Sequence, residues 1–331
     1  MTIRVGIIGA GTMGRAHAIA IDREIKGAAL AAVSEPEERN VAALRAAIGP
    51  VAIFADPEDL ITSPDVDAVI IASPDHTHAG YTAACIRRGK PVLCEKPLAD
   101  TSAACRQIAS HAASPEAPPV LVGFMRRFDP AYRSLKMELA RDEVGPLRLI
   151  RCVHRNRVAP AFFTGAMGIS NAMVHEFDIL RWLTGAEPVR VLVSAPPANA
   201  QERDPLLALV ELSNGALADI EVSMNAGYGY DIRTQVLGRE GMIEMAAPSF
   251  AQVGVNGRMV EVPCADFVER FADAYRVMLS CWVQGIGNGI PTAEGASAVD
   301  GLRAMQAAEA AIASLRSGGW SPVPPVGRDP W

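Results

Sequence analysis

The stretch IRVGIIGAGTMGRAHAIAIDREI, residues 3–25, decides the fold of the N-terminal half of the chain. Its first part, IRVGII, is a short run of mostly apolar residues that predicts a buried strand. The glycine-rich GAGTMG follows at once, and the remainder has the composition of a helix. A strand, a glycine turn and a helix in this order predict the first unit of a dinucleotide-binding Rossmann domain.

The glycines of this turn, Gly9, Gly11 and Gly14, form a GxGxxG pattern. The first permits the tight turn, the second lets the backbone approach a pyrophosphate, and the third lets helix and strand pack closely. The helix N-terminus supplies N–H groups and a positive dipole to the anion. Alone the pattern is weak, but between a strand and a helix it predicts cofactor binding. The residues expected to contact the cofactor here are Gly9, Gly11, Thr12, Met13 and Gly14.

The second expected strand, AALAAVSE, ends in Ser34 and Glu35. An acidic side chain about 20 residues past the last glycine accepts hydrogen bonds from the ribose hydroxyls and repels a 2′-phosphate. The sequence therefore favours NAD over NADP. Two alternatives remain open: Glu35 is a solvated carboxylate of the charged cluster SEPEER, or Ser34 and Arg39 tolerate the phosphate.

Strand and helix patterns alternate up to about residue 120, which predicts a parallel sheet covered on both faces. After a Pro-rich linker, the strands between about 147 and 262 become longer and partly alternating, and the turn signals SNG and REG join several of them as hairpins. The expected fold class is α/β. It comprises a Rossmann domain, residues 1–122, and a second α/β domain, residues 123–331, with a large open mixed or antiparallel sheet and a C-terminal helix at about 293–316.

Composition narrows the function classes. The 331 residues are 50% hydrophobic and 21% charged, as expected for two globular domains. A net charge of −6 without a Lys/Arg run argues against a nucleic-acid surface. No apolar stretch reaches the roughly 18 residues of a membrane span, and the N-terminus lacks a signal-peptide pattern. The six scattered cysteines predict reduced thiols in a cytoplasmic protein, and no metal site is indicated.

Lys96, in CEKPLA, ends an expected strand just before Pro97. Ligands of an open parallel sheet bind outside the carboxyl ends of its strands. A lysine there can bind a substrate hydroxyl and stabilise the developing alkoxide as hydride leaves. A surface lysine in a loop is the alternative that composition alone favours.

The motifs together resemble those of the Gfo/Idh/MocA oxidoreductases, over nearly the whole chain. The GxGxxG turn, Glu95-Lys96-Pro97 and GFMRRFDPAY carry this resemblance, and four further segments are similar to the inositol dehydrogenases of that family. It implies an NAD-dependent enzyme that oxidises a CH–OH group of a cyclic polyol, with hydride passing to nicotinamide C4, and a homotetramer. The four segments are CVHRN (152–156), MVHEFDILRWL (173–183), YGYDI (228–232) and VLGREGMIEM (236–245).

The resemblance also implies roles for single residues. Lys96 matches the active-site lysine, and His175 matches the catalytic base. Asn171 stands where inositol dehydrogenases carry an aspartate four residues before that base. The substrate would contact Met125, Arg126, His154, Asn156 and Tyr230, and the cofactor would also contact Ser73, His76, Glu95 and Lys96.

Asn171 and His175 are spaced so that a helix would place both on one face. Histidine suits a base for alcohol oxidation because its unperturbed pKa lies near neutrality. An asparagine can orient the imidazole but supplies no negative charge, and it can stabilise the wrong tautomer. Asn171 can instead cap the helix, and Asp178 can serve as the carboxylate partner of His175.

The asparagine leaves three interpretations of the activity open. The enzyme oxidises a related polyol, an aldose or an anhydrosugar with a modified relay. The protein is a weak catalyst, or a regulator that senses NAD and sugar on the same fold. Or the chain carries a deliberate Asp-to-Asn change at position 171 that lowers activity.

Overall fold

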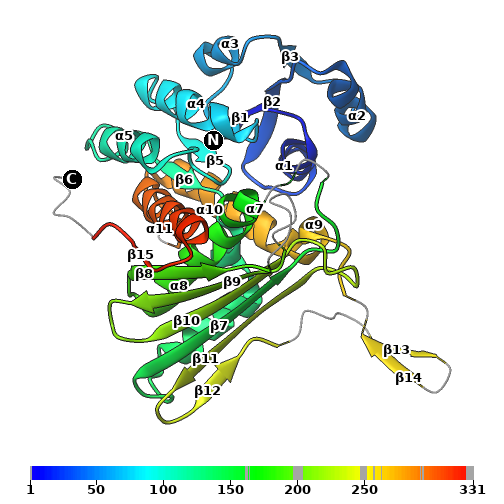
Figure 1. Cartoon of the computed structure of the whole chain (residues 1–331). Coiled ribbons are helices and arrows are strands. Elements are labelled where there is room, and N and C mark those ends of the chain that lie inside the picture. Colours follow the sequence, from blue (N-terminus) through cyan, green and yellow to red (C-terminus); the bar gives the residue numbers. More distant parts are fainter. Residues whose placement is uncertain are drawn as a thin grey trace. The chain divides into compact units, whose positions relative to one another are not determined.

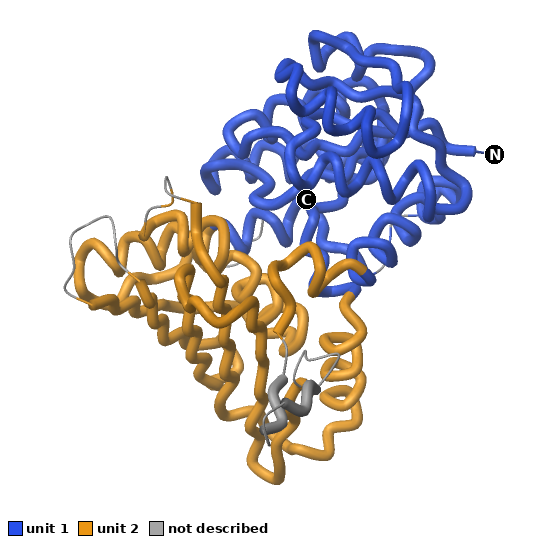
Figure 2. Tube along the Cα trace, turned by 90° about the vertical axis from the view of Figure 1, so that its right-hand side faces the viewer, with its two compact units in different colours: residues 1–128, 273–305, 330–331 blue, residues 129–272, 306–329 orange. Residues whose placement is uncertain are grey.

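The computed structural model of the chain describes residues 2–160, 163, 165–196, 204–246, 252–255, 258–261, 263–290, 292 and 294–325. The chain divides into two compact units, which Figure 2 colours separately. The first holds residues 1–128 and 273–305, and the second holds residues 129–272 and 306–329. The sequence predicted a single boundary after residue 122, which placed the segment 273–305 in the second domain. In the structure this segment belongs to the first unit.

The first unit is built on a six-stranded parallel sheet in the order β3-β2-β1-β4-β5-β6. Its central strands are almost wholly buried, because helices cover both faces, so the sequence shows continuous apolar runs rather than alternation. The predicted Rossmann domain is confirmed (Figure 1). The strands are β1 (Ile3–Ile8), β2 (Ala28–Ser34), β3 (Ala52–Phe54), β4 (Ala68–Ile71), β5 (Val92–Cys94) and β6 (Val120–Val122). The helices are α1 (Thr12–Arg23), α2 (Glu38–Ile48), α3 (Pro57–Thr62), α4 (Asp75–Arg87) and α5 (Ser102–Ala112).

The carboxyl ends of three neighbouring strands of this sheet lie in one row. Ile8 of β1 pairs with Ile71 of β4, which pairs in turn with Cys94 of β5. The chain leaves these strands through the glycine turn, the Ser73 loop and the Lys96 loop. Because β1 lies between β2 and β4, the strand order reverses here, and open parallel sheets bind ligands at such a point.

Helix α10 (Ala272–Asn288) explains why the segment 273–305 belongs to the first unit. The helix buries Met278 and Trp282, and the segment after it joins the sheet through a backbone bridge between Val122 and Ala296. An amphipathic pattern shows that a helix face is buried, but not against which domain. The C-terminal helix α11 (Ala298–Ser317) begins only after this bridge, later than the expected residue 293.

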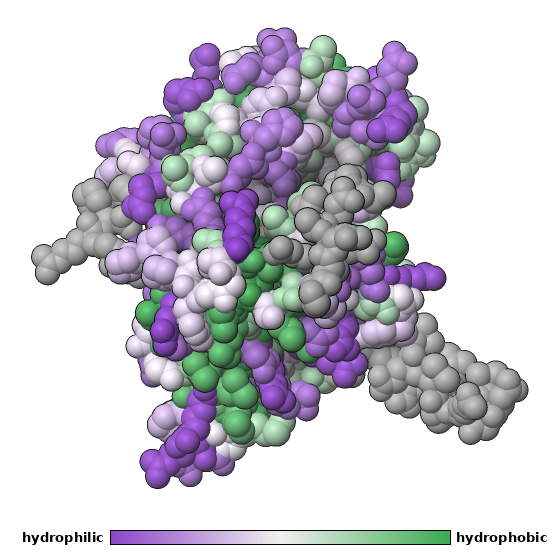
Figure 3. Space-filling view, in the orientation of Figure 1, coloured by the Kyte–Doolittle hydropathy of each residue, from purple (hydrophilic) through white to green (hydrophobic). Residues whose placement is uncertain are grey.

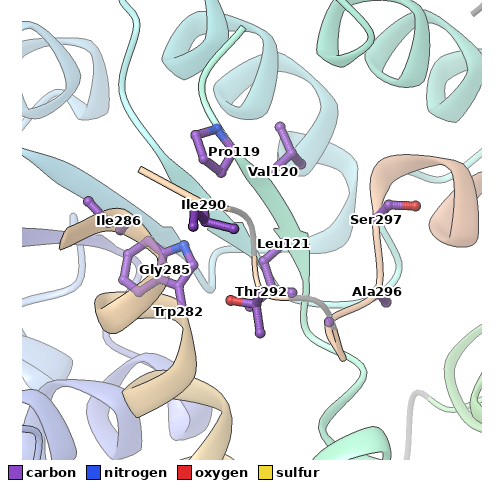
Figure 4. A pocket seen from close by; sticks show the side chains of 11 residues that line it. Pro119, Val120, Leu121, Trp282, Gly285, Ile286, Ile290, Thr292, Ala296 and Ser297 are labelled. Carbon is purple, nitrogen blue, oxygen red and sulfur yellow. The ribbon is translucent and has the colours of Figure 1, made fainter. Parts of the chain in front are cut away.

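Figure 4 shows a small pocket of about 70 Å³ beside α10 and β6. None of its lining side chains is ionisable, so the pocket offers packing space but no acid–base chemistry. The lining residues are Pro119, Val120, Leu121, Trp282, Gly285, Ile286, Ile290, Thr292, Gly295, Ala296 and Ser297.

The second unit contains a seven-stranded mixed sheet in the order β12-β11-β7-β10-β9-β8-β15. Strands β7 and β10 are parallel, and the other neighbours are antiparallel. The expected mixed sheet is confirmed, and so are the hairpins at SNG, between β9 and β10, and at REG, between β11 and β12. Its strands are β7 (Leu147–Arg155), β8 (Pro188–Ser194), β9 (Leu206–Leu212), β10 (Leu217–Ser223), β11 (Asp231–Gly238), β12 (Met242–Glu244) and β15 (Ser321–Pro322); β13 (Gln252–Val255) and β14 (Arg258–Glu261) pair separately.

The two faces of this sheet differ. Along β7, Cys152 and His154 are buried while Arg151 is exposed, as the pleat of a strand with one covered face requires. The covered face carries helices: the Tyr132 hydroxyl of α6 lies 3.1 Å from the Thr234 hydroxyl of β11. The remaining helices of this unit are α6 (Pro130–Leu139), α7 (Gly165–Met167), α8 (Val174–Thr184) and α9 (Phe267–Arg270), together with the second half of α11.

Candidate active site

The glycine turn of the first unit leaves the space that a dinucleotide needs. Gly9 has a φ of +92°, and a Cβ there would lie 2.6 Å from the carbonyl oxygen of Ala72. Gly14 packs directly on the Gly9 carbonyl, so no side chain fits. A Cβ on Gly11 would meet nothing within 4 Å in the described part of the chain. Packing thus requires glycine at 9 and 14, whereas the open space at Gly11 fits the close approach of a pyrophosphate.

Helix α1 begins directly after this turn and offers its N-terminus to an anion. Gly11 is the N-cap residue, no side chain caps the helix, and its first turn carries no acidic residue. Thr12 is exposed and Met13 is half-buried. The unpaired N–H groups and the positive end of the helix dipole therefore meet the requirements of a phosphate site.

Glu35 faces the glycine turn rather than the solvent. One carboxylate oxygen accepts a hydrogen bond from the Ala10 N–H at 2.6 Å, and the other accepts one from the Glu37 N–H at 2.9 Å. The residue is 7% exposed, so the alternative of a solvated carboxylate is wrong. Ser34 is also buried, whereas Arg39 is exposed. A buried carboxylate at this place favours ribose hydroxyls and disfavours a 2′-phosphate.

The loops after β4 and β5 are tied together by His78, a residue outside the expected site. Its Nδ1 lies 2.7 Å from the Pro97 carbonyl oxygen, and its Nε2 lies 2.9 Å from that of Ser73. Both nitrogens can donate only in the charged imidazolium. Burial opposes this charge, but Cys94 and the two carbonyl bonds outweigh burial and raise the pKa of His78 to about 10. His76, by contrast, is exposed, and its cofactor contact stays a prediction.

The Lys96 loop is anchored by His17 of α1. His17 Nε2 lies 2.7 Å from one carboxylate oxygen of Glu95, and both side chains are buried. The other oxygen accepts a hydrogen bond from the Lys96 N–H at 3.3 Å. Gly123 makes room for this arrangement, because a Cβ there would lie 2.7 Å from the Glu95 carboxylate. Glu95 thus holds the loop from inside, and its predicted cofactor contact remains a prediction.

The expected substrate segment GFMRRFD forms a buried 3₁₀ turn, Met125–Phe128. It follows β6, the neighbour of β5, so it lies at the same edge of the sheet as the Lys96 loop. Arg127 pairs with Asp300 at 3.2 Å and has a structural role, whereas Arg126 is 1% exposed. Substrate contacts of Met125 and Arg126 stay predictions.

In the second unit, three predicted site residues gather on the covered face of the sheet. The ring centroid of His154 lies 6.3 Å from that of His175 and 6.0 Å from that of Tyr230. All three are buried, and they come from β7, α8 and the residue before β11. His154 Nδ1 lies 3.2 Å from the carboxylate of Glu176, which follows His175 on α8. The structure thus brings the expected base together with two expected substrate contacts.

The neighbours of His154 on β7 have other contacts. The Asn156 amide nitrogen lies 3.0 Å from the sulfur of Met224, and its substrate contact stays a prediction. Arg155 donates to both carboxylate oxygens of Glu221, at 2.5 and 2.8 Å, and these bonds raise its pKa. Arg155 therefore forms an ion pair with Glu221. It also bonds the half-exposed Tyr228, so of the two tyrosines only Tyr230 joins the histidine cluster.

Asn171 does not cap a helix. The chain is helical from α7 through a π-helical segment, Gly168–Met173, into α8. Met167 and Met173, which flank that segment, have right-handed helical backbone angles rather than the extended angles of an N-cap. The capping alternative is therefore wrong, because Asn171 lies inside a continuous helical stretch.

The π-helical segment also bears on the expected contact between the side chains of Asn171 and His175. The expected contact rested on α-helical spacing, whereas a π turn is wider and shifts side chains around the axis. The Asn171 side-chain oxygen lies 3.4 Å from the Ser170 hydroxyl. A contact between Asn171 and His175 stays a prediction, as does the partnership of His175 with Asp178, which is fully buried on α8.

Three residues that the sequence did not single out contact predicted ones: His17 contacts Glu95, His78 spans Ser73 and Pro97, and Glu176 contacts His154. Among the described residues, no three His, Cys, Asp or Glu side chains gather as metal ligands would. Within that same part of the chain, every helix is too short or too polar to cross a membrane.

Comparison with known families identifies both units. Residues 3–124 match the model of the Gfo/Idh/MocA oxidoreductase family with an NAD-binding Rossmann fold. Residues 132–244 match the Gfo/Idh/MocA C-terminal domain.

Individual relatives are similar from end to end. Inositol 2-dehydrogenase 1 of Saccharopolyspora erythraea is 43% identical over 323 residues, covering 96% of this chain and 95% of the relative. An inositol 2-dehydrogenase of Klebsiella pneumoniae is 37% identical over 317 residues, covering 94% of each chain. Among solved structures, myo-inositol dehydrogenase from Lactobacillus casei in complex with NAD(H) and myo-inositol superposes with a TM-score of 0.91 at 26% identity, covering 99% of this chain and 98% of that one.

Proposed function

This chain belongs to the Gfo/Idh/MocA oxidoreductase family, and we propose that within it the protein is an NAD-dependent dehydrogenase of inositol. The reaction converts one ring CH–OH group to a ketone, with hydride passing to NAD and a proton leaving the hydroxyl. The observation that carries the substrate class is the end-to-end identity of 43% with an inositol 2-dehydrogenase. The buried histidine cluster supports the chemistry.

The residues of the glycine turn fit the cofactor. The open space at Gly11 and the uncapped N-terminus of α1 would hold the pyrophosphate, and Glu35 would hold the adenosine ribose. When bound, NAD supplies the hydride acceptor. The chain's own residues then bind and orient the polyol and move its proton.

We assign the proton transfer to His175, whose imidazole is buried beside His154 and Tyr230. A positioned base accepts the hydroxyl proton as the C–H bond breaks. Lys96 is assigned to the same hydroxyl as a cation that stabilises the alkoxide. Its loop is rigidly held, because the Glu95–His17 pair and His78 fix the residues on either side.

The direct test is NADH formation by the purified protein on a panel of myo-inositol, scyllo-inositol, glucose and a 1,5-anhydrosugar. We expect the highest kcat/KM with an inositol. A higher value with glucose or the anhydrosugar would replace inositol by a pyranose as the substrate class. Tight NAD binding without turnover on any of them would favour the regulator.

Cofactor choice gives a first prediction. Wild-type protein should prefer NAD to NADP by about 100-fold in kcat/KM, because the buried Glu35 carboxylate repels a 2′-phosphate. Glu35→Ser should lower kcat/KM with NAD and raise it with NADP. Steady-state kinetics with both cofactors measures the preference. Glu37→Gln is the matched control, since its carboxylate is exposed and only its backbone N–H contacts Glu35. Equal or higher kcat/KM of the wild type with NADP would refute the assignment.

We also propose that the protein works in the cytoplasm. All six cysteines are free thiols, and five of them are buried. Free thiols persist in reducing compartments.

The open face of the second sheet supports the proposal of a homotetramer. Figure 3 shows apolar side chains gathered over the strands of this sheet. A groove of about 490 Å³ runs there. Its lining combines the apolar residues Val153, Leu192, Leu207 and Leu209 with the charged residues Arg151, Asp219 and Glu221. Leu207 is 55% exposed, and an apolar surface of this kind marks an interface. We assign its occupant as the same sheet of a second copy of the chain.

The assembly proposal predicts the effect of a charge on this face. Leu207→Glu should lower the mass in solution from four chains to two or one, because a carboxylate would be desolvated in the interface. Light scattering coupled to gel filtration measures the mass. The matched control is Met137→Glu, a similarly exposed apolar residue on α6, the helix that packs on the opposite, covered face of the sheet. Wild-type protein that elutes as a monomer, or a Leu207→Glu variant that stays tetrameric, would contradict the proposal.

A further inference from the structure

We propose that Glu176 is a positioning residue that acts through His154: it holds the proton of His154 on Nδ1, so that Nε2 is the nitrogen that accepts a hydrogen bond from a substrate hydroxyl. The inference rests on the proposed function, because it assumes that the histidine cluster binds the polyol. It goes beyond that function by giving a role to a carboxylate that the sequence pattern and the family motifs left unassigned.

The tautomer follows from the contact with Glu176, taken as an ionised carboxylate. His154 Nδ1 lies 3.2 Å from the carboxylate of Glu176, and the two side chains are 4% and 1% exposed. An ionised carboxylate has no proton to donate, so the Nδ1 atom must carry it. In the neutral imidazole the proton on Nδ1 leaves Nε2 as the acceptor. A hydroxyl of the substrate can then donate a hydrogen bond to Nε2 and keep its proton.

Burial makes this contact costly to lose. A buried carboxylate without a partner costs much more free energy than one that is hydrogen-bonded. Glu176 lies on α8 and His154 on β7, so the hydrogen bond also ties the helix to the covered face of the sheet. The low polarity of these buried surroundings also strengthens the hydrogen bond between Glu176 and His154.

An aromatic ring packs against the imidazole of His154, and a second ring packs against the first. Tyr230 meets His154 edge-on, at 79° and 6.0 Å between ring centroids. Phe271 meets Tyr230 in the same way, at 85° and 6.2 Å. The His154 ring is therefore held by a carboxylate at one nitrogen and by packing along its side. A fixed ring loses little conformational entropy when a substrate binds.

The carboxylate also separates the roles of two neighbouring imidazoles. His154 and His175 lie 6.3 Å apart between ring centroids, and residue 171 on the same helical stretch is an uncharged asparagine. Glu176 is bonded to His154, which makes His154 an acceptor of fixed tautomer. His154 then binds and orients a hydroxyl, while His175 is assigned to take the proton of the reacting one.

The first test is the tautomer itself in the wild-type protein. Nitrogen-15 NMR of histidine-labelled protein distinguishes a proton on Nδ1 from one on Nε2, and His154→Gln identifies the signal by its loss. We expect the Nδ1–H form in the free protein. A resting Nε2–H form of His154 would overturn the proposal, whatever the enzyme's activity.

The second test replaces the carboxylate by an amide in the full-length enzyme. Glu176→Gln can donate its amide N–H to Nδ1 and so stabilise the Nε2–H tautomer, which no longer accepts a hydroxyl proton. We expect a fall in inositol kcat/KM of about 10- to 100-fold, mostly through KM, with unchanged NAD affinity. Glu176→Asp, which restores a carboxylate, should recover part of the loss. Glu187→Gln is the matched control, since this part-buried carboxylate of the same unit pairs with Arg181.

A double-variant cycle separates positioning from mere stability. If Glu176 acts through His154, the Glu176→Gln/His154→Gln protein should be no worse in kcat/KM than His154→Gln alone. Additive losses would assign Glu176 a general structural role and overturn the proposal, as would a Glu176→Gln enzyme with wild-type kcat/KM. Failure of the proposed function can be told apart from failure of the Glu176 proposal. The first would appear as absent turnover of inositol in the wild type, and the tautomer measurement would still test the role of Glu176.

Discussion

Replacing Lys96 by Ala should lower kcat for inositol oxidation by about 100- to 1,000-fold, the cost of losing one group that stabilises a developing oxyanion. The reason is local: the Lys96 loop leaves β5 at the edge where the strand order reverses, and the Glu95–His17 pair fixes its backbone. The ammonium is therefore presented from a rigid support. Steady-state kinetics at saturating NAD and inositol measures the effect.

Three comparisons make the Lys96 result specific. Lys96→Met keeps the apolar stem but not the charge, and it should lose as much kcat as Lys96→Ala. Lys26→Ala, at an exposed lysine of the same unit, should leave kcat unchanged. NAD affinity, measured by calorimetry, should change by no more than a few-fold in any of these proteins. A Lys96→Met enzyme with near wild-type kcat would remove the lysine from the chemistry.

The sequence allowed prediction of those parts of the protein in which the residue types permit only one local backbone conformation. Gly9 needs a positive φ and Gly14 has no room for a Cβ, so the turn could be recognised from its spacing. Continuous apolar strands in the first half predicted a parallel sheet, and the longer, partly alternating strands with their hairpin turn signals predicted a mixed or antiparallel sheet in the second half. Both sheets have the predicted character.

What the sequence did not disclose depends on packing between distant segments. Helix α10 has an ordinary amphipathic pattern, and nothing in that pattern names the unit on which it packs. Asn171 lies in a π-helical segment inside a continuous helical stretch, so the N-cap interpretation, which rested on the residue type alone, was wrong.

The same limit applies inside the site. His17, His78 and Glu176 lie 78, 19 and 22 positions from their partners Glu95, Pro97 and His154. Such pairs become visible only when the fold brings their elements together. The residues predicted to touch ligands carry motifs, whereas the residues that hold them in place do not, because any group of suitable shape and charge can serve as a support.

Replacing His175 by Gln should lower kcat by about 100- to 10,000-fold, the range that positioned acid–base catalysis contributes. Glutamine keeps a polar side chain of similar reach but cannot accept the hydroxyl proton. Inositol KM should change less than kcat, because His154 and its Glu176 partner remain to bind the ring. Kinetics across a pH series measures this, and the residual rate should rise with pH as hydroxide replaces the missing base.

The controls for His175 decide between a base and a packing residue. His111→Gln, at an exposed histidine of α5, should leave the kinetics unchanged. The melting temperature of His175→Gln should stay close to that of the wild type if its loss of kcat is chemical. A carboxylate restored beside the base by Asn171→Asp should raise wild-type kcat but leave His175→Gln unimproved, because a stabilised imidazolium requires the imidazole. Equal gains in both backgrounds would mean that residue 171 acts on the substrate directly, and a His175→Gln enzyme with wild-type kcat would assign the proton transfer to another group.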